Sequence, residues 1–232
     1  MNVAQFRYGS DNLGYILYSF QTALAIDAGA PEEMLRFTEE NGLALRYLTN
    51  THRHMDHTTG NETLLSRTGA DYLDFRYLMK KGRINMEEES VIVFHTPGHT
   101  EDSICFYVDP YLITGDTLFN GKVGKCFTGD PDSFLKSIKT LLTLPDPTLV
   151  YAGHDYVEEY MEFARRLEPD NPHIDDYLRG YDPKHVCAPL SEEKKVDPFL
   201  RFNDEKIINI LKKRGLAVDT ERARWRSLLS LM

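Results

Sequence analysis

Side chains that bind metals are concentrated in one short segment, HRHMDH at residues 52–57. His52, His54, Asp56 and His57 offer four possible ligands within six residues. In an extended segment His52 and His54 point to the same side, and the chain can then turn to present Asp56 and His57. A helical zinc site of the HExxH type needs histidines at positions i and i+4, and this segment lacks that spacing. The segment therefore predicts a metal site built on an extended loop.

Three more candidates follow apolar runs farther along the chain. His99 ends Thr-Pro-Gly-His after VIVFH, Asp116 follows YLIT and a glycine, and His154 follows TLVYA and a glycine. A lone histidine is more often packed or solvated than bound to a metal. Here that interpretation needs a dense hexapeptide and two Gly-His strand ends to coincide by chance. Imidazole and carboxylate groups are ligands that Zn, Fe and Mn accept, so we predict two divalent metal ions of this kind.

Such a site is suited to hydrolysis. Two metal ions about 3.5–4 Å apart can hold a bridging hydroxide, polarise a carbonyl group and stabilise the oxyanion that forms. No GxSxG elbow or Cys/His motif supplies an alternative nucleophile. A thioester suits this chemistry because its thiol has a pKa of about 8.5, so the thiolate leaves with little proton donation. The chain shows no obvious general acid outside the ligands, which also favours a good leaving group.

The predicted elements place these residues at strand ends. Strands are predicted at residues 3–8, 14–19, 22–27, 45–49, 91–96, 103–108, 111–114 and 148–152. Helices are predicted at residues 31–41, 131–144, 156–167, around 207–211 and at 221–231. Strands dominate the first half and helices then take over, which indicates a layered α/β or α+β fold rather than a regular βαβ repeat. Prolines interrupt the chain from about residue 168, so we predict a body at residues 1–167 and a helical C-terminal region at residues 168–232.

Composition narrows the function classes. The 232 residues are enough for one large domain, and 41% hydrophobic and 27% charged residues are ordinary for a globular protein. A net charge of −9 disfavours a nucleic-acid partner, and no apolar run is long enough for a membrane span. Residues 191–232 nevertheless carry 10 basic and 7 acidic groups. Three widely spaced cysteines and an N-terminus without a signal-like run predict the cytoplasm, and Cys105 alternates as a buried strand residue.

The segment at 52–57 resembles the HxHxDH signature of the metallo-β-lactamase superfamily, and Asp27, His99, Asp116 and His154 can be placed at its other motifs. The resemblance implies a four-layer αβ/βα sandwich. It also implies that His52, His54 and His99 bind one metal, that Asp56, His57 and His154 bind the other, and that Asp116 bridges them. Asp56 and Asp116 would be the catalytic carboxylates beside the bridging hydroxide. Asp27 would support the loop rather than bind metal.

Segments away from these motifs resemble glyoxalase II, the hydroxyacylglutathione hydrolases. The similar positions are Lys125 in GKVGKCFTGD, Tyr156 in GHDYVEEY, and Arg201 and Lys206 in and after DPFLR. The resemblance implies that these four residues hold glutathione, and that the substrate is S-D-lactoylglutathione, which gives D-lactate and glutathione. A cationic C-terminal segment suits such an anionic small molecule. A monomer or weak oligomer is expected.

Each of the four residues also has a plainer interpretation. Lys125, Arg201 and Lys206 could be solvated, and Tyr156 could start the apolar face of a helix. The chain also departs from the family pattern. Phe127 stands where a tyrosine is common, which removes one hydroxyl contact, and Glu101-Asp102 add negative charge after His99.

Two other functions compete with thioester hydrolysis. A persulfide dioxygenase would use one iron held by His52, His99 and Asp116, but such relatives generally lack the DPFLR segment. A metal-binding scaffold without activity would be expected to have lost ligands, and this chain keeps the full set. A lactamase or nuclease is disfavoured, the nuclease by the acidic body.

Overall fold

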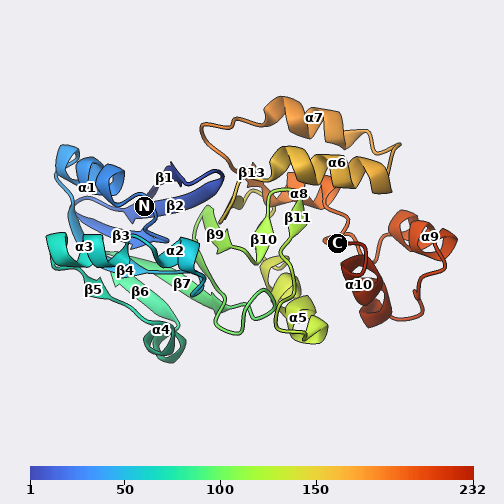
Figure 1. Ribbon diagram of the computed structural model, residues 1–232, viewed down its shortest axis with the longest axis horizontal. Helices are drawn as coiled ribbons and strands as arrows, with labels where there is room; N and C mark the ends of the chain where they lie inside the picture. Colours follow the sequence, from blue (N-terminus) through green and yellow to red (C-terminus); the bar gives the residue numbers. More distant parts are fainter.

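The computed structural model describes all 232 residues, and its strands form two large sheets and one short hairpin. Figure 1 shows the strands on the left and in the centre, with the helices of the last third of the chain gathered toward the right. The first sheet has the order β1-β2-β3-β4-β5, with antiparallel pairing up to β3 and parallel pairing beyond it. Its strands are β1 (Asn2–Tyr8), β2 (Asn12–Tyr18), β3 (Thr22–Ile26), β4 (Ala44–Thr49) and β5 (Asp71–Tyr72).

The second sheet has the order β13-β12-β9-β8-β7-β6, and β12 and β9 are its parallel pair. Its strands are β6 (Arg83–Met86), β7 (Glu89–His95), β8 (Ile104–Val108), β9 (Tyr111–Gly115), β12 (Leu149–Ala152) and β13 (Ala188–Pro189). The separate hairpin pairs β10 (Leu118–Phe119) with β11 (Lys122–Val123).

The alternation of side chains along each strand makes four layers. In β2, Tyr15 and Leu17 join a 23-residue core that includes Phe106 of the second sheet, whereas Ile16 points to a separate core. Because successive side chains of a strand point to opposite faces, the two sheets must pack face to face. The outer cores are closed by helices, with α1 and α3 on the first sheet and α5 on the second. The predicted αβ/βα sandwich is therefore confirmed.

Local sequence signals explain several of these helices. α1 (Pro31–Glu40) begins with a proline at its first turn. α5 (Pro131–Leu141) begins in the same way and is capped by Asp130, whose carboxylate accepts hydrogen bonds from the next backbone N–H groups. α4 (Phe75–Lys81) is capped by Asp74 and ends at Gly82 in the left-handed conformation. The remaining helices of the body are α2 (Met55–Thr58), α3 (Asn61–Thr68) and α6 (Val157–Leu167).

The C-terminal region contains four helices, α7 (His173–Gly180), α8 (Leu190–Val196), α9 (Glu205–Lys213) and α10 (Glu221–Leu229). The buried residues of α9 and α10 join the outer core of the second sheet, whereas those of α7 join the core between the sheets and α8 contributes to both. Trp225 of α10 is fully buried, its ring packs on Phe134 of α5, and its indole N–H donates to the Pro131 carbonyl oxygen at 2.8 Å. The last helix is thereby fixed to the body, while the division at residue 167 stays a prediction.

The predicted elements match the structure closely where periodicity was strong, and the short elements were missed. The prediction of buried Cys105 is confirmed, since its side chain is fully enclosed. The elements that were not predicted are α2, α3, α4, α7, α8, β5, β6, β10, β11 and β13. No helix combines the length and apolarity that crossing a bilayer requires.

Candidate metal centre

The seven predicted metal ligands meet at one edge of the sandwich, where both sheets end. His52 and His54 follow β4 of the first sheet, and the single turn α2 carries Asp56 and His57. The second sheet contributes His99 after β7, Asp116 after β9 and His154 after β12. The short turn of α2 explains how the loop can present four ligands, because it reverses the chain directly after the extended His54.

Close approach of the strand ends requires a glycine. A Cβ atom on Gly153 would lie 2.2 Å from Asp116 Oδ1 and 2.8 Å from the His57 ring. Both contacts are far shorter than packed atoms tolerate, so any side chain here would displace two predicted ligands. The Gly-His pairs noted in the sequence therefore have a steric reason at this strand end.

The possible metal-binding atoms form two neighbouring groups. In the first group, the ligand atoms of His52, His54, His99 and Asp116 lie within 4.8 Å of one another. The ligand atoms of Asp56, His57 and His154 form the second group under the same limit.

Asp116 faces both groups. Its Oδ1 lies 3.4 Å from His57 Nε2, and its Oδ2 lies 3.4 Å from His99 Nε2 and 3.6 Å from His154 Nε2.

In three histidines, the ring nitrogen that points away from the centre lies within hydrogen-bond distance of a protein acceptor. His57 Nδ1 lies 2.9 Å from the Asp27 carboxylate, and His154 Nδ1 lies 2.7 Å from the Asp11 carboxylate. His99 Nδ1 lies 3.0 Å from the carbonyl oxygen of Lys125. A neutral imidazole has one N–H, so donating it outward leaves the Nε2 lone pair facing the centre. This is the usual support for metal-binding histidines.

His52 is oriented through Thr51. The Thr51 hydroxyl donates its proton to Asp27 at 2.7 Å, so its oxygen can only accept from His52 Nδ1, at 3.1 Å. His52 Nε2 therefore also carries a lone pair. Asp27 is fully buried and holds a positive φ of 56°, and its other oxygen accepts the Thr51 backbone N–H at 2.8 Å. Asp27 thus supports the loop, as the sequence resemblance implied.

The converging lone pairs fit a cation. His54 Nδ1 lies 2.9 Å from His52 Nε2 and 3.1 Å from His99 Nε2, and it can donate a proton to at most one of them. His57 Nε2 and Asp116 Oδ1 are buried without any hydrogen-bond partner. Buried polar atoms of this kind are costly unless something binds them. Imidazole nitrogens and carboxylate oxygens around the gap are the donors that divalent Zn, Fe and Mn accept.

The electrostatics of the centre also favour a positive ion. Burial, with His57 nearby, lowers the pKa of His52 to about 4, so this ring is neutral. Burial acts against protonation of His57 too, but the carboxylates of Asp27 and Asp116 raise its pKa to about 11. For Asp116 burial opposes ionisation, but the His154 and His57 rings that face it hold its pKa well below the usual range. The centre therefore attracts one positive charge to His57 Nε2, which a metal ion can supply in place of a proton.

Two of the four predicted substrate-binding residues lie beside the centre. The Tyr156 ring stacks on the His154 ring at 5.0 Å between centroids, and its hydroxyl lies 3.3 Å from His154 Nδ1. Lys125 is exposed, forms no ion pair and places Nζ 5.1 Å from the Phe127 ring centroid. Phe127 is 58% exposed and its ring lies 5.1 Å from the His99 ring. The rings of Tyr156 and Phe127 and the unpaired ammonium group of Lys125 thus border the histidines.

The other two residues contact none of the seven predicted ligands. The Arg201 guanidinium binds both oxygens of the fully buried Glu168 carboxylate, at 2.6 and 3.0 Å, and also contacts Asp204. Lys206 Nζ lies 3.1 Å from Asp170. These cations already have anionic partners, so their role in substrate binding stays a prediction.

Some supporting residues carried no local signal in the sequence. Asp11 and His154 are 143 positions apart, and the next residue, Asn12 at the start of β2, reaches Asp56 Oδ2 at 2.8 Å. The main-chain oxygen of Lys125 could not be identified from residue type at all. In contrast, the extra charge of Asp102 is balanced locally, because Arg53 binds it at 2.6 Å.

Comparisons with known proteins agree with this fold. Residues 80–154 match the metallo-beta-lactamase superfamily, and residues 155–225 match the hydroxyacylglutathione hydrolase C-terminus. The solved structure of ETHE1 from Myxococcus xanthus is similar with a TM-score of 0.66 and 24% identity, covering 98% of this chain and 99% of that one. TTHA1623, solved in a di-iron-bound form, has a TM-score of 0.60 at 23% identity and covers 85% of this chain and 100% of that one. The sandwich and its histidine-rich edge define a metallo-beta-lactamase fold.

Sequence relatives narrow the assignment within that fold. Hydroxyacylglutathione hydrolase from Maricaulis maris is 34% identical over 227 residues, which are 88% of this chain and 88% of the relative. The enzyme of the same name from Hydrogenovibrio crunogenus is 32% identical over 225 residues, covering 88% of this chain and 84% of the relative. The chain belongs to the hydroxyacylglutathione hydrolase family.

Proposed function

We propose that this protein is a metal-dependent thioesterase that hydrolyses S-D-lactoylglutathione, or a related S-acylglutathione, to the hydroxy acid and glutathione. The observation that carries the proposal is the convergence of two donor groups on Asp116, with four imidazoles oriented by acceptors outside the centre. His52, His54 and His99 would hold one divalent ion, Asp56, His57 and His154 would hold a second, and Asp116 would contact both. Zn, Fe and Mn all suit these donors.

Bound divalent ions would activate water and polarise the thioester carbonyl group. The chain itself orients these groups. Burial alone would raise the pKa of Asp56, but His57 and the Asn12 amide lower it, so its Oδ2 stays ionised and can hold a metal or accept a proton. The rings of Phe127 and Tyr156 border the place where the acyl group would lie. The thiolate is a weak base and a good leaving group, so it departs without a dedicated general acid and takes up a proton afterwards.

Lys125 is proposed to bind a carboxylate of the glutathione moiety. Replacing it in Lys125→Ala should raise KM for the thioester about tenfold, the value of one charge-assisted hydrogen bond, with little change in kcat. The backbone oxygen that supports His99 is retained in this variant. Steady-state kinetics against Lys212→Ala, an exposed lysine on α9 without an ion pair, would check this. Equal KM values for the two variants would exclude a role for the Lys125 ammonium group.

Arg201→Ala tests a second proposed carboxylate contact and a structural role together. The buried Glu168 would lose its bidentate partner, and breaking a buried pair costs about 3 kcal/mol or more, so Tm should fall. If the guanidinium also binds glutathione, KM should rise much more than kcat falls. Kinetics well below Tm separate the two effects. A lower Tm with unchanged KM would leave Arg201 a purely structural residue. The exposed Arg222→Ala serves as control.

The proposed function is tested by following two products in one set of assays. Release of glutathione thiol from S-D-lactoylglutathione supports the proposal. Oxygen uptake with glutathione persulfide, and no thiol release, would instead indicate a mononuclear iron dioxygenase. Bound metal with neither activity would indicate a metal-binding scaffold. A cytoplasmic location and a monomeric or weakly associating state are proposed along with this function.

A further inference from the structure

The β10–β11 hairpin connects two parts of the metal centre. Asp116 lies two residues before β10, and Lys125 lies two residues after β11. The hairpin has just two residue pairs, and an isolated two-stranded hairpin is marginally stable at best. It therefore needs support from the rest of the fold to keep a fixed position.

The hairpin lies against three of the seven predicted metal ligands. Its exit segment supplies the Lys125 carbonyl oxygen that accepts from His99. The Phe119 ring of β10 lies 6.0 Å from the His154 ring centroid. At the base of the hairpin, a Cβ on Gly124 would lie 1.8 Å from the Asp116 backbone oxygen, so the two ends are in close contact. A displaced hairpin would disturb His99, His154 and Asp116 together.

Glu193 of α8 reaches across from the C-terminal region to the turn of this hairpin. Its carboxylate accepts the Gly121 backbone N–H at 2.6 Å and the Asn120 side-chain N–H at 2.8 Å. The Tyr177 hydroxyl of α7 donates to the same carboxylate at 2.6 Å. Glu193 is fully buried, although it belongs to a residue type that is rarely buried without a partner.

The partners of Glu193 explain why a carboxylate is used. All three are neutral donors, and no cation lies within ion-pair distance of it. Burial raises the pKa of Glu193 to about 7 despite these hydrogen bonds, so ionising this carboxylate costs free energy. A glutamine would offer one oxygen and turn an N–H toward a donor. An unpaired buried donor is itself unfavourable.

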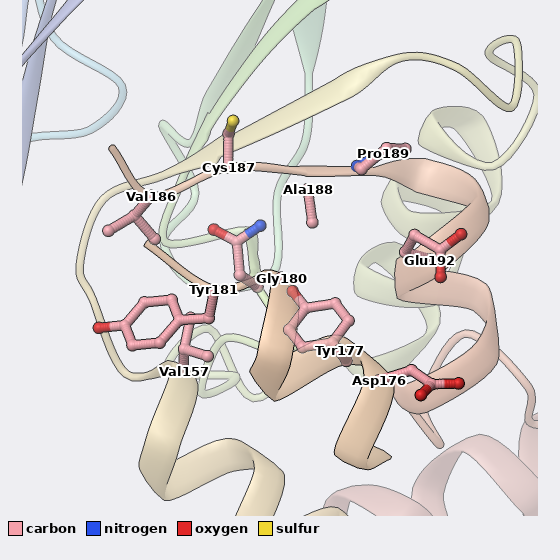
Figure 2. Close-up of a pocket in the computed structure, with 11 residues that line it drawn as sticks. Val157, Asp176, Tyr177, Gly180, Tyr181, Val186, Cys187, Ala188, Pro189 and Glu192 are labelled. Atoms are coloured by element: carbon pink, nitrogen blue, oxygen red, sulfur yellow. The ribbon is translucent and has the colours of Figure 1, made fainter. Parts of the chain in front are cut away.

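A cavity adjoins this junction. Asn120 and Tyr177 also line a cavity of about 230 Å³ between α6, α7, α8 and β13. Figure 2 shows Tyr177 on α7 and Glu192 on α8 on the walls of this cavity, with Val157 and Val186 nearby. None of the seven predicted metal ligands lines it. Leu118 and Val123 of the hairpin pack into the core beneath α5, whereas its turn residues Asn120 and Gly121 are held by the Glu193 carboxylate.

We propose that Glu193 is a positioning residue for the metal centre, which it acts on by anchoring the β10–β11 hairpin. The inference rests on the proposed metal site and function. It gives the C-terminal region a second role besides substrate binding, since α8 holds the segment between Asp116 and the Lys125 carbonyl oxygen.

The test compares Glu193→Gln with the neighbouring Glu192→Gln, which removes a partly exposed carboxylate paired to Lys195. Cobalt(II) is used as the metal probe. Glu193→Gln should lower kcat about tenfold, in the range of changes to groups that support metal ligands, with KM within about twofold. Its visible cobalt absorption should shift, and a chelator should remove its cobalt faster. Glu192→Gln should behave like the unmodified protein. Tyr177→Phe, which removes one donor, should show a smaller change in the same direction.

Unchanged kcat, cobalt absorption and cobalt retention in Glu193→Gln, with a lower Tm alone, would overturn the proposal and leave Glu193 a stabilising residue. If the unmodified protein has no thioesterase activity, the proposed function fails. The cobalt absorption and retention then decide the role of Glu193 independently.

Discussion

Replacing Asp116 with alanine is expected to abolish metal binding and thioester hydrolysis together. Its two oxygens face both donor groups, at 3.4 Å from His57 Nε2 and 3.4 Å from His99 Nε2. No other carboxylate lies between the groups, so a cation there would lose its shared anionic ligand. The loss of activity should exceed about 100-fold, the upper range for residues that support ligands from outside. Metal content per chain and kcat should be measured on the same preparation.

The control for this variant is Asp219→Ala, which removes an exposed carboxylate without an ion pair. It should retain both metal and activity. An Asp116→Ala protein that keeps its metal and most of its hydrolysis would contradict the assignment of Asp116 to both groups. Retention of metal with loss of hydrolysis would place Asp116 in the reaction but remove it from metal binding.

Asp27→Asn is expected to weaken metal affinity and kcat by about 10- to 100-fold without unfolding the protein. Asp27 accepts hydrogen bonds from His57 Nδ1 and from the backbone and hydroxyl of Thr51. Asparagine tolerates the φ of 56° at this position, but it has one acceptor oxygen and no charge. Both His57 and His52 would lose their fixed orientation. Metal affinity by chelator competition and kcat would check the expectation.

Glu87→Gln is the matched control for Asp27→Asn. Glu87 also has a positive φ, of 53°, and its carboxylate also accepts backbone N–H groups, at Gln21 and Thr22. It contacts none of the predicted ligands. Equal metal affinity in both variants would show that Asp27 shapes the loop without influencing the metal.

Most of the candidate metal centre could be predicted from the sequence, because its predicted ligands are either close together or mark strand ends. His52 to His57 share one hexapeptide, and the Gly-His pairs at residues 98–99 and 153–154 break apolar runs. Their outer partners could not be predicted in this way. Asp11 contacts His154 across 143 positions in the sequence. Which ring nitrogen of His52 carries the proton depends on the direction of the Thr51 hydroxyl hydrogen bond.

Charge in the C-terminal region was less informative than the ligand motif. Arg201 was predicted as a substrate contact from its segment and sign, but a count of charges does not reveal that Glu168 is buried beneath it. The same limit applies to Glu193, which reads as one of several acidic residues on a short helix. Its burial depends on the packing of α7, α8 and the β10–β11 hairpin, which no local pattern encodes.

Secondary structure could likewise be predicted only in part. The sheet strands had apolar alternation, and both α1 and α5 had prolines at their first turns. α4 was missed although Asp74 and Gly82 provide a cap at each end. Seven residues with mixed polarity carry too little periodicity to be recognised without the surrounding fold.

On the proposed function, the edge formed by the seven predicted ligands binds divalent metal and uses it to hydrolyse a glutathione thioester. The most direct measurement is a metal titration of chelator-stripped, folded protein, in which thiol release from S-D-lactoylglutathione is followed at each addition of Zn, Fe or Mn. The expected result is no hydrolysis in the stripped protein, a rate that rises with bound metal, and loss of that rate when chelator is added again. Hydrolysis that persists in the stripped protein, or fully loaded protein that releases no thiol, would contradict the claim.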